Sequence, residues 1–154
     1  MTKLNKLDFL KKQVELEQQI IETAEKSVAD VKNKLVKELI MSIALDSKKH
    51  ESLLSTLIVM NTEVPPYIEE EKLDELATNI KKHIELEAKA IQTYKELLDV
   101  LENEKEKLII REIFNDENRH HLLLKKIHEM IIKQEAITEE DMFEFLKDDY
   151  IPQF

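Results

Sequence analysis

The chain contains an internal repeat at an offset of 70 residues, which constrains the fold more than any other feature of the sequence. Residues 12–17 (KQVELE) match residues 82–87 (KHIELE), and residues 46–50 (DSKKH) match residues 116–120 (DENRH). The apolar residues that repeat at the same offset are Ile40 with Ile110, Ile43 with Ile113, Leu53 with Leu123, and Leu54 with Leu124. No insertion separates the matched segments in either copy, so the sequence predicts two similar halves.

The composition favours helices in both halves. The chain has 154 residues, with no glycine, only three prolines and 36% charged residues. Long helices use such mixtures of Glu, Lys, Leu and Ile, whereas a sheet with tight turns needs glycine. Apolar residues recur at helical spacing. They predict helices at about 7–27, 31–60, 69–101 and 105–133.

The breaks between these helices define two hairpins. The clearest break is at residues 61–66, where two prolines cannot continue a helix. We therefore predict an all-α fold with one ferritin-like domain over residues 1–154: a four-helix bundle of two pseudo-twofold hairpins, 7–60 and 69–133. Thr138 and the acidic residues after it predict a short fifth helix at 138–148.

Charge and composition exclude several classes of partner and site. The formal net charge of −10 argues against nucleic acid and against an anionic membrane surface, because both need a basic face. The absence of cysteine excludes disulfides and thiolate metal sites. No apolar run approaches the roughly 20 residues of a membrane span, and no cleavable signal segment is visible. We therefore expect a cytoplasmic protein.

Glu117 and His120 form a Glu-x-x-His pair in the second copy of the repeat. Residues three apart lie on one face of a helix, and a carboxylate with an imidazole on an inward face can bind a transition metal. A single pair of this kind arises often by chance in a glutamate-rich chain. The repeat strengthens the interpretation, because the first helix of the same hairpin supplies Glu87.

The first copy contains most of the same residues. Glu17 matches Glu87, and His50 matches His120. The departure is Ser47, which stands where the second copy has a glutamate. The duplicated set is therefore complete only in the second hairpin.

This paired arrangement resembles the ferritin-like superfamily of carboxylate-bridged di-metal proteins, and the rubrerythrin-like branch most of all. The resemblance covers residues 7–133, and the second copy is also similar to the Asp-Glu-x-Arg-His motif of di-iron oxygenases and desaturases. It implies bound iron, with manganese or zinc as alternatives. The implied ligands are Glu17 and Glu87 as terminal carboxylates, Glu117 as a bridge, and His50 and His120 as imidazoles. The implied neighbours are Asp46 and Asp116 as acceptors for imidazole N–H groups, with Arg119 and Lys49 as balancing charges.

Ser47 leaves three ligand arrangements open. Glu51, four residues further on, could supply the missing carboxylate. His83, one turn before Glu87 where the first copy has Gln13, could supply an imidazole instead. The third arrangement holds a single metal with the complete set of the second hairpin. We favour two metals with an altered ligand set.

Four other polar residues are not expected to bind metal. His121 is not expected to be a ligand, and His128 is expected at the surface. Glu15 and Glu85 lie about 160° around the helix from the predicted ligands and belong to the outer face.

The resemblance implies a protein that handles dioxygen, peroxide or Fe(II), as an oxidoreductase of the peroxidase or ferroxidase type. These activities and iron storage share nearly the same ligands, so no substrate and no catalytic residue are predicted. Because cysteine is absent, an electron donor would be a separate protein. We expect a homodimer. The alternative function is a metal-free or mononuclear helical bundle with a structural or interaction role, which Ser47 favours.

Overall fold

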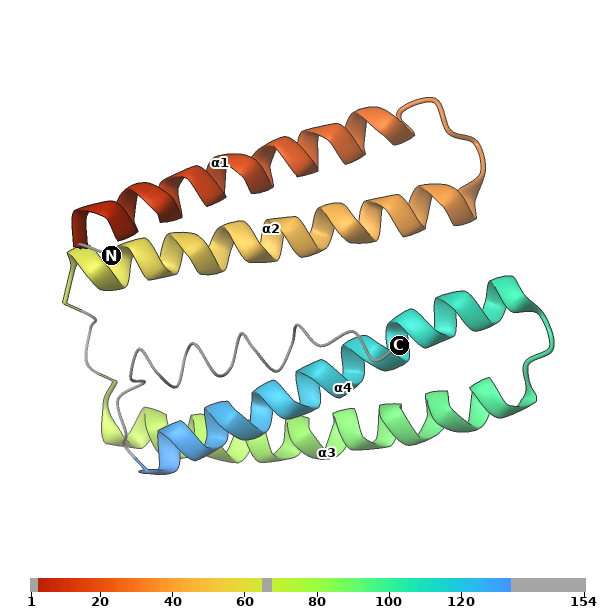
Figure 1. The fold of residues 1–154 in the computed structure, drawn as a ribbon. Helices are drawn as coiled ribbons and strands as arrows, with labels where there is room; N and C mark the ends of the chain where they lie inside the picture. The colour runs from red at the N-terminus through yellow and green to blue at the C-terminus, as the bar shows by residue number, and fades with distance from the viewer. Residues whose placement is uncertain (1–2, 65–67, 134–154) are drawn as a thin grey trace. The chain divides into compact units, whose positions relative to one another are not determined.

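The computed structural model describes residues 3–64 and 68–133, which form four α-helices (Figure 1). They are α1 (Lys3–Val28), α2 (Lys34–Thr62), α3 (Glu70–Val100) and α4 (Glu104–Lys133). No strand occurs in these two ranges, and the all-α prediction is confirmed. The predicted fifth helix at 138–148 lies outside the described residues.

The helices divide into two units, each of which contains two consecutive helices. Unit 1 spans Met1–Tyr67 and contains α1 and α2, while unit 2 spans Ile68–Phe154 and contains α3 and α4. Within each unit the two helices run antiparallel, side by side (Figure 1). Among the described residues, no helix has an apolar stretch long enough to cross a lipid bilayer.

One asparagine caps the start of the second helix in each hairpin. The Oδ1 atom of Asn33 accepts a hydrogen bond from the backbone N–H of Val36 at 3.1 Å. The Oδ1 atom of Asn103 accepts one from the backbone N–H of Lys105 at 2.9 Å. Asparagine is a preferred N-cap because its side chain satisfies a free N–H of the first turn. Asn33 and Asn103 are 70 residues apart, so the repeat includes the caps, and α2 begins at Lys34 rather than near residue 31 as predicted.

In unit 1, α1 buries one stripe of aliphatic side chains. The buried residues of this stripe are Leu10, Ile21, Ala24 and Val28. On α2, Ala44 is fully buried and Ser47, three residues later on the same face, is 4% exposed. The serine that replaces the predicted carboxylate therefore lies in the interior of its hairpin.

In unit 2, a carboxylate occupies the buried face of α3. Ile80 and Glu87, two turns apart on that face, are 6% and 8% exposed. The half-buried apolar residues of α3 and α4 include Ile84, Ile91, Leu98, Ile110, Phe114 and Leu124. A carboxylate among aliphatic side chains is unfavourable unless a cation, a proton or a hydrogen-bond donor compensates it.

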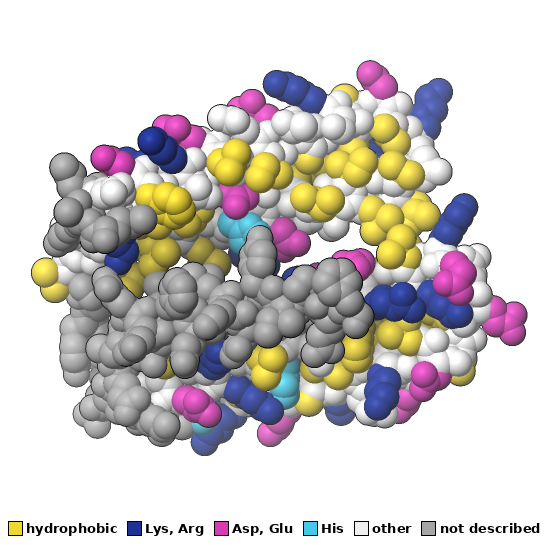
Figure 2. All heavy atoms as spheres, in the orientation of Figure 1, with side chains coloured by type: hydrophobic (Ala, Val, Ile, Leu, Met, Phe, Trp, Pro, Cys, Tyr) yellow, Lys and Arg dark blue, Asp and Glu magenta, His cyan; other side chains and the backbone are white. Residues whose placement is uncertain are grey.

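Each hairpin also leaves a second apolar stripe exposed. The repeat-equivalent residues Leu16 of α1 and Leu86 of α3 are 48% and 55% exposed. Ile43 and Leu53 of α2 are each 57% exposed, and Leu123 of α4, the equivalent of Leu53, is 38% exposed. Figure 2 shows hydrophobic side chains gathered along one face of the α1–α2 hairpin. Exposed apolar surface of this extent is typical of faces that pack against a partner.

Candidate metal centre

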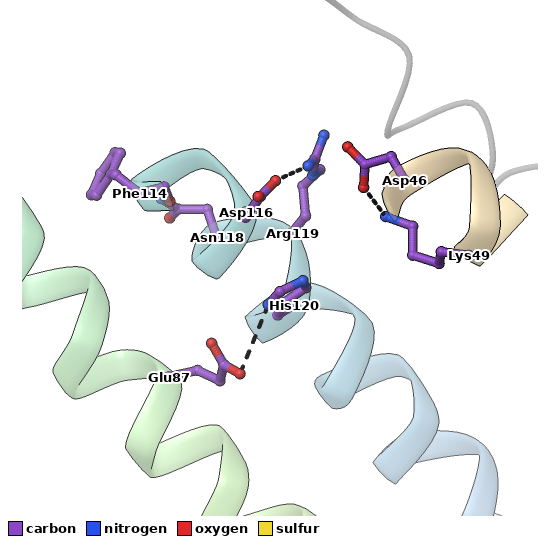
Figure 3. Close-up of polar contacts among 8 residues, drawn as sticks. All are labelled: Asp46, Lys49, Glu87, Phe114, Asp116, Asn118, Arg119 and His120. Atoms are coloured by element: carbon purple, nitrogen blue, oxygen red, sulfur yellow. Dashed lines mark hydrogen bonds and ion pairs between the residues drawn. The ribbon is translucent and has the colours of Figure 1, made fainter. Parts of the chain in front are cut away.

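Glu87 of α3 converges with Glu117 and His120 of α4. One potential ligand atom from each side chain lies within 4.8 Å of the others. The Nδ1 atom of His120 lies 4.0 Å from the Oε1 atom of Glu87 (Figure 3). The two α4 residues share a face because they are three positions apart, and their contact distances place that face toward Glu87. The structure thus brings together the complete set predicted for the second hairpin.

The Glu87 carboxylate is buried without full compensation. Its Oε2 atom is buried and has no hydrogen-bond partner in the described part of the chain. A buried, unpaired carboxylate oxygen costs folding free energy, and native structures rarely contain one without a functional reason. A bound cation would satisfy this oxygen.

The Glu117 carboxyl lies beside Glu87, which raises its pKa. The pKa of Glu117 is raised from its ordinary value of 4.5 to about 7, first by a hydrogen bond with the Glu87 carboxyl, then by burial and by the charge of Glu87. That hydrogen bond requires one of the two carboxyls to be protonated, so it does not relieve Glu87 when both are ionised. Two carboxyls that compete for one proton provide a charge that a divalent cation would neutralise.

His83 lies beside this cluster, one turn before Glu87 on α3. Its Nε2 atom is 2.9 Å from Oε1 of Glu87, and its side chain is 56% exposed. The same carboxylate oxygen is therefore approached by imidazoles from both helices of the hairpin. The sequence prediction placed His83 on the face of Glu87, and the structure places it in contact.

The first hairpin contains the equivalent pair without a third member. The Nδ1 atom of His50 lies 3.4 Å from Oε1 of Glu17. The Oε2 atom of Glu17 is buried without a hydrogen-bond partner, as is that of Glu87. Because Ser47 provides no carboxylate, unit 1 has no group of three candidate ligands within its described residues.

Glu51 is held away from this pair by a different contact. Its Oε1 atom accepts a hydrogen bond from Nε2 of Gln18 on α1 at 2.7 Å. The structure does not bring Glu51 into a group with Glu17 and His50 within the described residues. Its predicted role as a substitute ligand stays a prediction.

The two aspartates predicted to orient the imidazoles pair with basic residues of their own helix. Asp46 binds Nζ of Lys49 at 3.0 Å, and Asp116 binds the guanidinium of Arg119 (Figure 3). Residues three apart on a helix are neighbours, so these ion pairs form locally without help from the rest of the fold. The predicted contact of each aspartate with an imidazole stays a prediction, and the basic residues do neutralise nearby carboxylates.

Two histidines of α4 each have one buried ring nitrogen. Nδ1 of His121 and Nε2 of His128 are buried and have no hydrogen-bond partner in the described residues. The expectation that His128 lies at the surface was wrong, since the residue is half-buried. The signal was present in the spacing: His128 is two turns after His121, and four residues after the half-buried Leu124, on the face that packs on α3.

The donor set of the second hairpin fits a divalent transition metal. It provides carboxylate oxygen and imidazole nitrogen, which suit Fe(II), Mn(II) and Zn(II), with a buried oxygen that lacks a partner. Comparisons with family models, with curated proteins and with solved structures found no match to this chain. The ferritin-like resemblance therefore rests on the residues of the repeat.

Proposed function

We propose that this chain is a ferritin-like metal-binding protein that holds iron, with manganese or zinc as alternatives, and acts on dioxygen, peroxide or Fe(II). The observation that supports this proposal most is the convergence of Glu87, Glu117 and His120, in which the neighbouring Glu87 carboxyl raises the pKa of Glu117. His83 contacts the carboxylate of Glu87, and His120 approaches it.

The proposal includes the packing of the two hairpins into one four-helix bundle. In α2, Ile43, His50 and Leu53 are spaced by seven and three residues and so lie on one stripe. The equivalent residues of α4 are Ile113, His120 and Leu123. Burial of these stripes against each other would cover the exposed apolar surface of both hairpins and enclose both histidines in one core.

In such a bundle the two hairpins contribute unequal halves of a site. The second hairpin supplies Glu87, Glu117 and His120, and the first supplies Glu17 and His50. Glu117 would lose its proton when a cation arrives, because a metal ligand must be deprotonated. Bound iron or manganese would supply the electrons that reduce dioxygen or peroxide.

The surrounding charges would hold the ligands rather than react. Arg119 and Lys49 neutralise Asp116 and Asp46, which limits the excess negative charge beside the site. No cysteine is present, so a separate protein would deliver electrons. We also propose that the chain forms a homodimer.

A second candidate is a metal-free or mononuclear helical module, which the buried Ser47 favours. Ser47 is 4% exposed and supplies a hydroxyl where the complete set has a carboxylate. In the metal-free case, the carboxyls of Glu87 and Glu117 would destabilise the hairpin, and no bound metal would offset that cost.

Metal content and melting temperature distinguish the metal-binding proposal from a metal-free module. Untagged protein should contain close to one or more metal ions per chain after anaerobic Fe(II) loading. Glu117→Ala should lower the melting temperature only of the metal-loaded protein, because a bound metal ion stabilises the folded state and the variant binds it less well. Glu112→Ala, an exposed change on the same helix, is the matched control and should have no such effect.

Metal content far below one ion per chain would contradict the proposal. So would a Glu117→Ala variant that melts at an unchanged or higher temperature with and without iron. That second result is the one expected of a metal-free module, since removal of a buried carboxylate stabilises it.

A further inference from the structure

We propose that His83 is an additional metal ligand of the second hairpin and binds through Nε2. This inference rests on the proposed function, because it adds a donor to the same site. It also answers how the chain compensates for Ser47.

The contact places an imidazole nitrogen next to a candidate ligand atom. Nε2 of His83 lies 2.9 Å from Oε1 of Glu87, and Nδ1 of His120 lies 4.0 Å from the same oxygen. His83 and Glu87 are four residues apart on α3, the spacing at which two helical side chains can chelate one metal ion. Glu87 is thus positioned between two imidazoles.

The 2.9 Å separation matches adjacent donors on one octahedral metal ion. With metal–ligand bonds of about 2.1 Å, neighbouring donor atoms in octahedral coordination lie about 3.0 Å apart. The same separation fits an N–H···O hydrogen bond, so His83 in the metal-free chain can donate to the oxygen beside which it would later bind. His83 is not in the group of ligand atoms that lie within 4.8 Å of one another, so its exposed side chain would turn toward Glu117 and His120 on metal binding.

The repeat shows that the imidazole is specific to the second hairpin. Position 83 corresponds to Gln13, which has no metal-binding nitrogen, while position 117 corresponds to Ser47. A complete duplication would provide two histidines and four glutamates. Ser47 removes one glutamate, and His83 restores the number of donors with an imidazole in its place.

This exchange changes the metal that the site prefers. The second hairpin would offer two imidazoles and two carboxylates to one ion, with less negative charge than a glutamate-rich set. Imidazole suits zinc, copper, iron and nickel, whereas carboxylate-rich sets suit magnesium, calcium and manganese. We therefore infer that the site discriminates against Mn(II) in favour of Fe(II) and Zn(II).

Replacement of His83 by glutamine tests the inference. Glutamine keeps an N–H donor for Glu87 but removes the imidazole nitrogen. The variant His83→Gln therefore tests whether the side chain binds the metal or only donates a hydrogen bond. His83 is 56% exposed at its side chain, and the change should leave helix content unaffected. Gln13→Ala, at the equivalent position of the first hairpin, is the matched control.

The probe is Cu(II) added below one equivalent to the full chain, with pulsed electron paramagnetic resonance to count coordinated imidazoles. His83→Gln should show one imidazole fewer than the unaltered chain and bind Zn(II) more weakly by about tenfold or more. Gln13→Ala should match the unaltered chain in both measurements.

Two results would overturn the inference in different ways. If His83→Gln keeps the imidazole count and the Zn(II) affinity while Glu117→Gln loses binding, His83 only donates a hydrogen bond and the proposed function stands. If neither variant changes metal binding, the metal lies elsewhere and both proposals fail.

Discussion

The Nδ1 atom of His50 lies 3.4 Å from the Oε1 atom of Glu17, which joins α2 to α1 across the first hairpin. Seventy residues later, the same two atoms of His120 and Glu87 lie 4.0 Å apart and join α4 to α3. The repeat is therefore preserved at the level of individual contacts between helices. What differs between the hairpins is the third position, serine in one and glutamate in the other.

The raised pKa of Glu117 predicts a pH dependence of the metal-free protein. Its pKa is about 7 in the folded chain against an ordinary value of 4.5, so between these values the folded state retains a proton that the unfolded state has released. The free energy of unfolding should therefore fall as pH rises from about 4.5 to about 7 and change no further from this group above that range.

The measurement is urea unfolding of the metal-free chain and of Glu117→Gln at several pH values. The amide resembles the protonated carboxyl, so the variant should lack this part of the decrease. A difference between the two proteins that stays constant from pH 4.5 to 8 would contradict the raised pKa of Glu117.

Glu87→Gln should return the pKa of Glu117 toward 4.5, because the charge and the hydrogen bond of Glu87 are causes of the increase. The carboxyl carbon resonance of Glu117, followed by NMR through a pH titration, reports this directly. Glu85→Gln is the control: Glu85 is exposed, two residues away on the outer face, and its removal should leave the Glu117 pKa near 7. Equal titration in both variants would show that burial alone raises the pKa.

Ser47→Glu should restore the complete duplicated set. The side chain at this position is 4% exposed, so an added carboxylate should lower the unfolding free energy of the metal-free chain by at least about 1 kcal/mol. When Fe(II) or Zn(II) is added, the variant should bind the second, more weakly held metal ion more tightly than the unaltered chain does. Calorimetric titration measures both metal ions, and Ser52→Glu on the exposed side of α2 is the control. Unchanged metal binding would exclude position 47 from the site.

Asn33→Ala and Asn103→Ala should each lower the unfolding free energy by about 1 kcal/mol, because each removes the N-cap of a long helix. Thermal unfolding of the metal-free chain measures the loss. Asn79→Ala, exposed within α3, should cost little or nothing because alanine is the better helix former there. Equal effects at all three positions would contradict the capping role.

The helices and hairpins could be predicted because their signals are local. Apolar spacing and the prolines near residue 65 determine where helices run and end, and a glycine-free chain leaves few alternatives. The convergence of Glu87 with Glu117 and His120 could also be predicted, since both helices belong to one hairpin and the repeat fixes their register.

Other features depend on competition between nearby side chains, which spacing does not reveal. Asp116 could accept from an imidazole or from Arg119, and the i, i+3 geometry favours the guanidinium. Helical spacing favours a half-buried His128, but the prediction gave more weight to the polar character of histidine and placed it at the surface. The role of Asn103 as a cap required recognition that the repeat extends into the turn before α4.

That Glu87, Glu117 and His120 hold a metal ion is tested most directly by anomalous scattering from crystals grown after anaerobic Fe(II) loading. The predicted result is an iron peak about 2.0–2.3 Å from a carboxylate oxygen of Glu87, a carboxylate oxygen of Glu117 and a ring nitrogen of His120. A map from loaded crystals with no peak among these three side chains, or with peaks only at surface carboxylates, would contradict it.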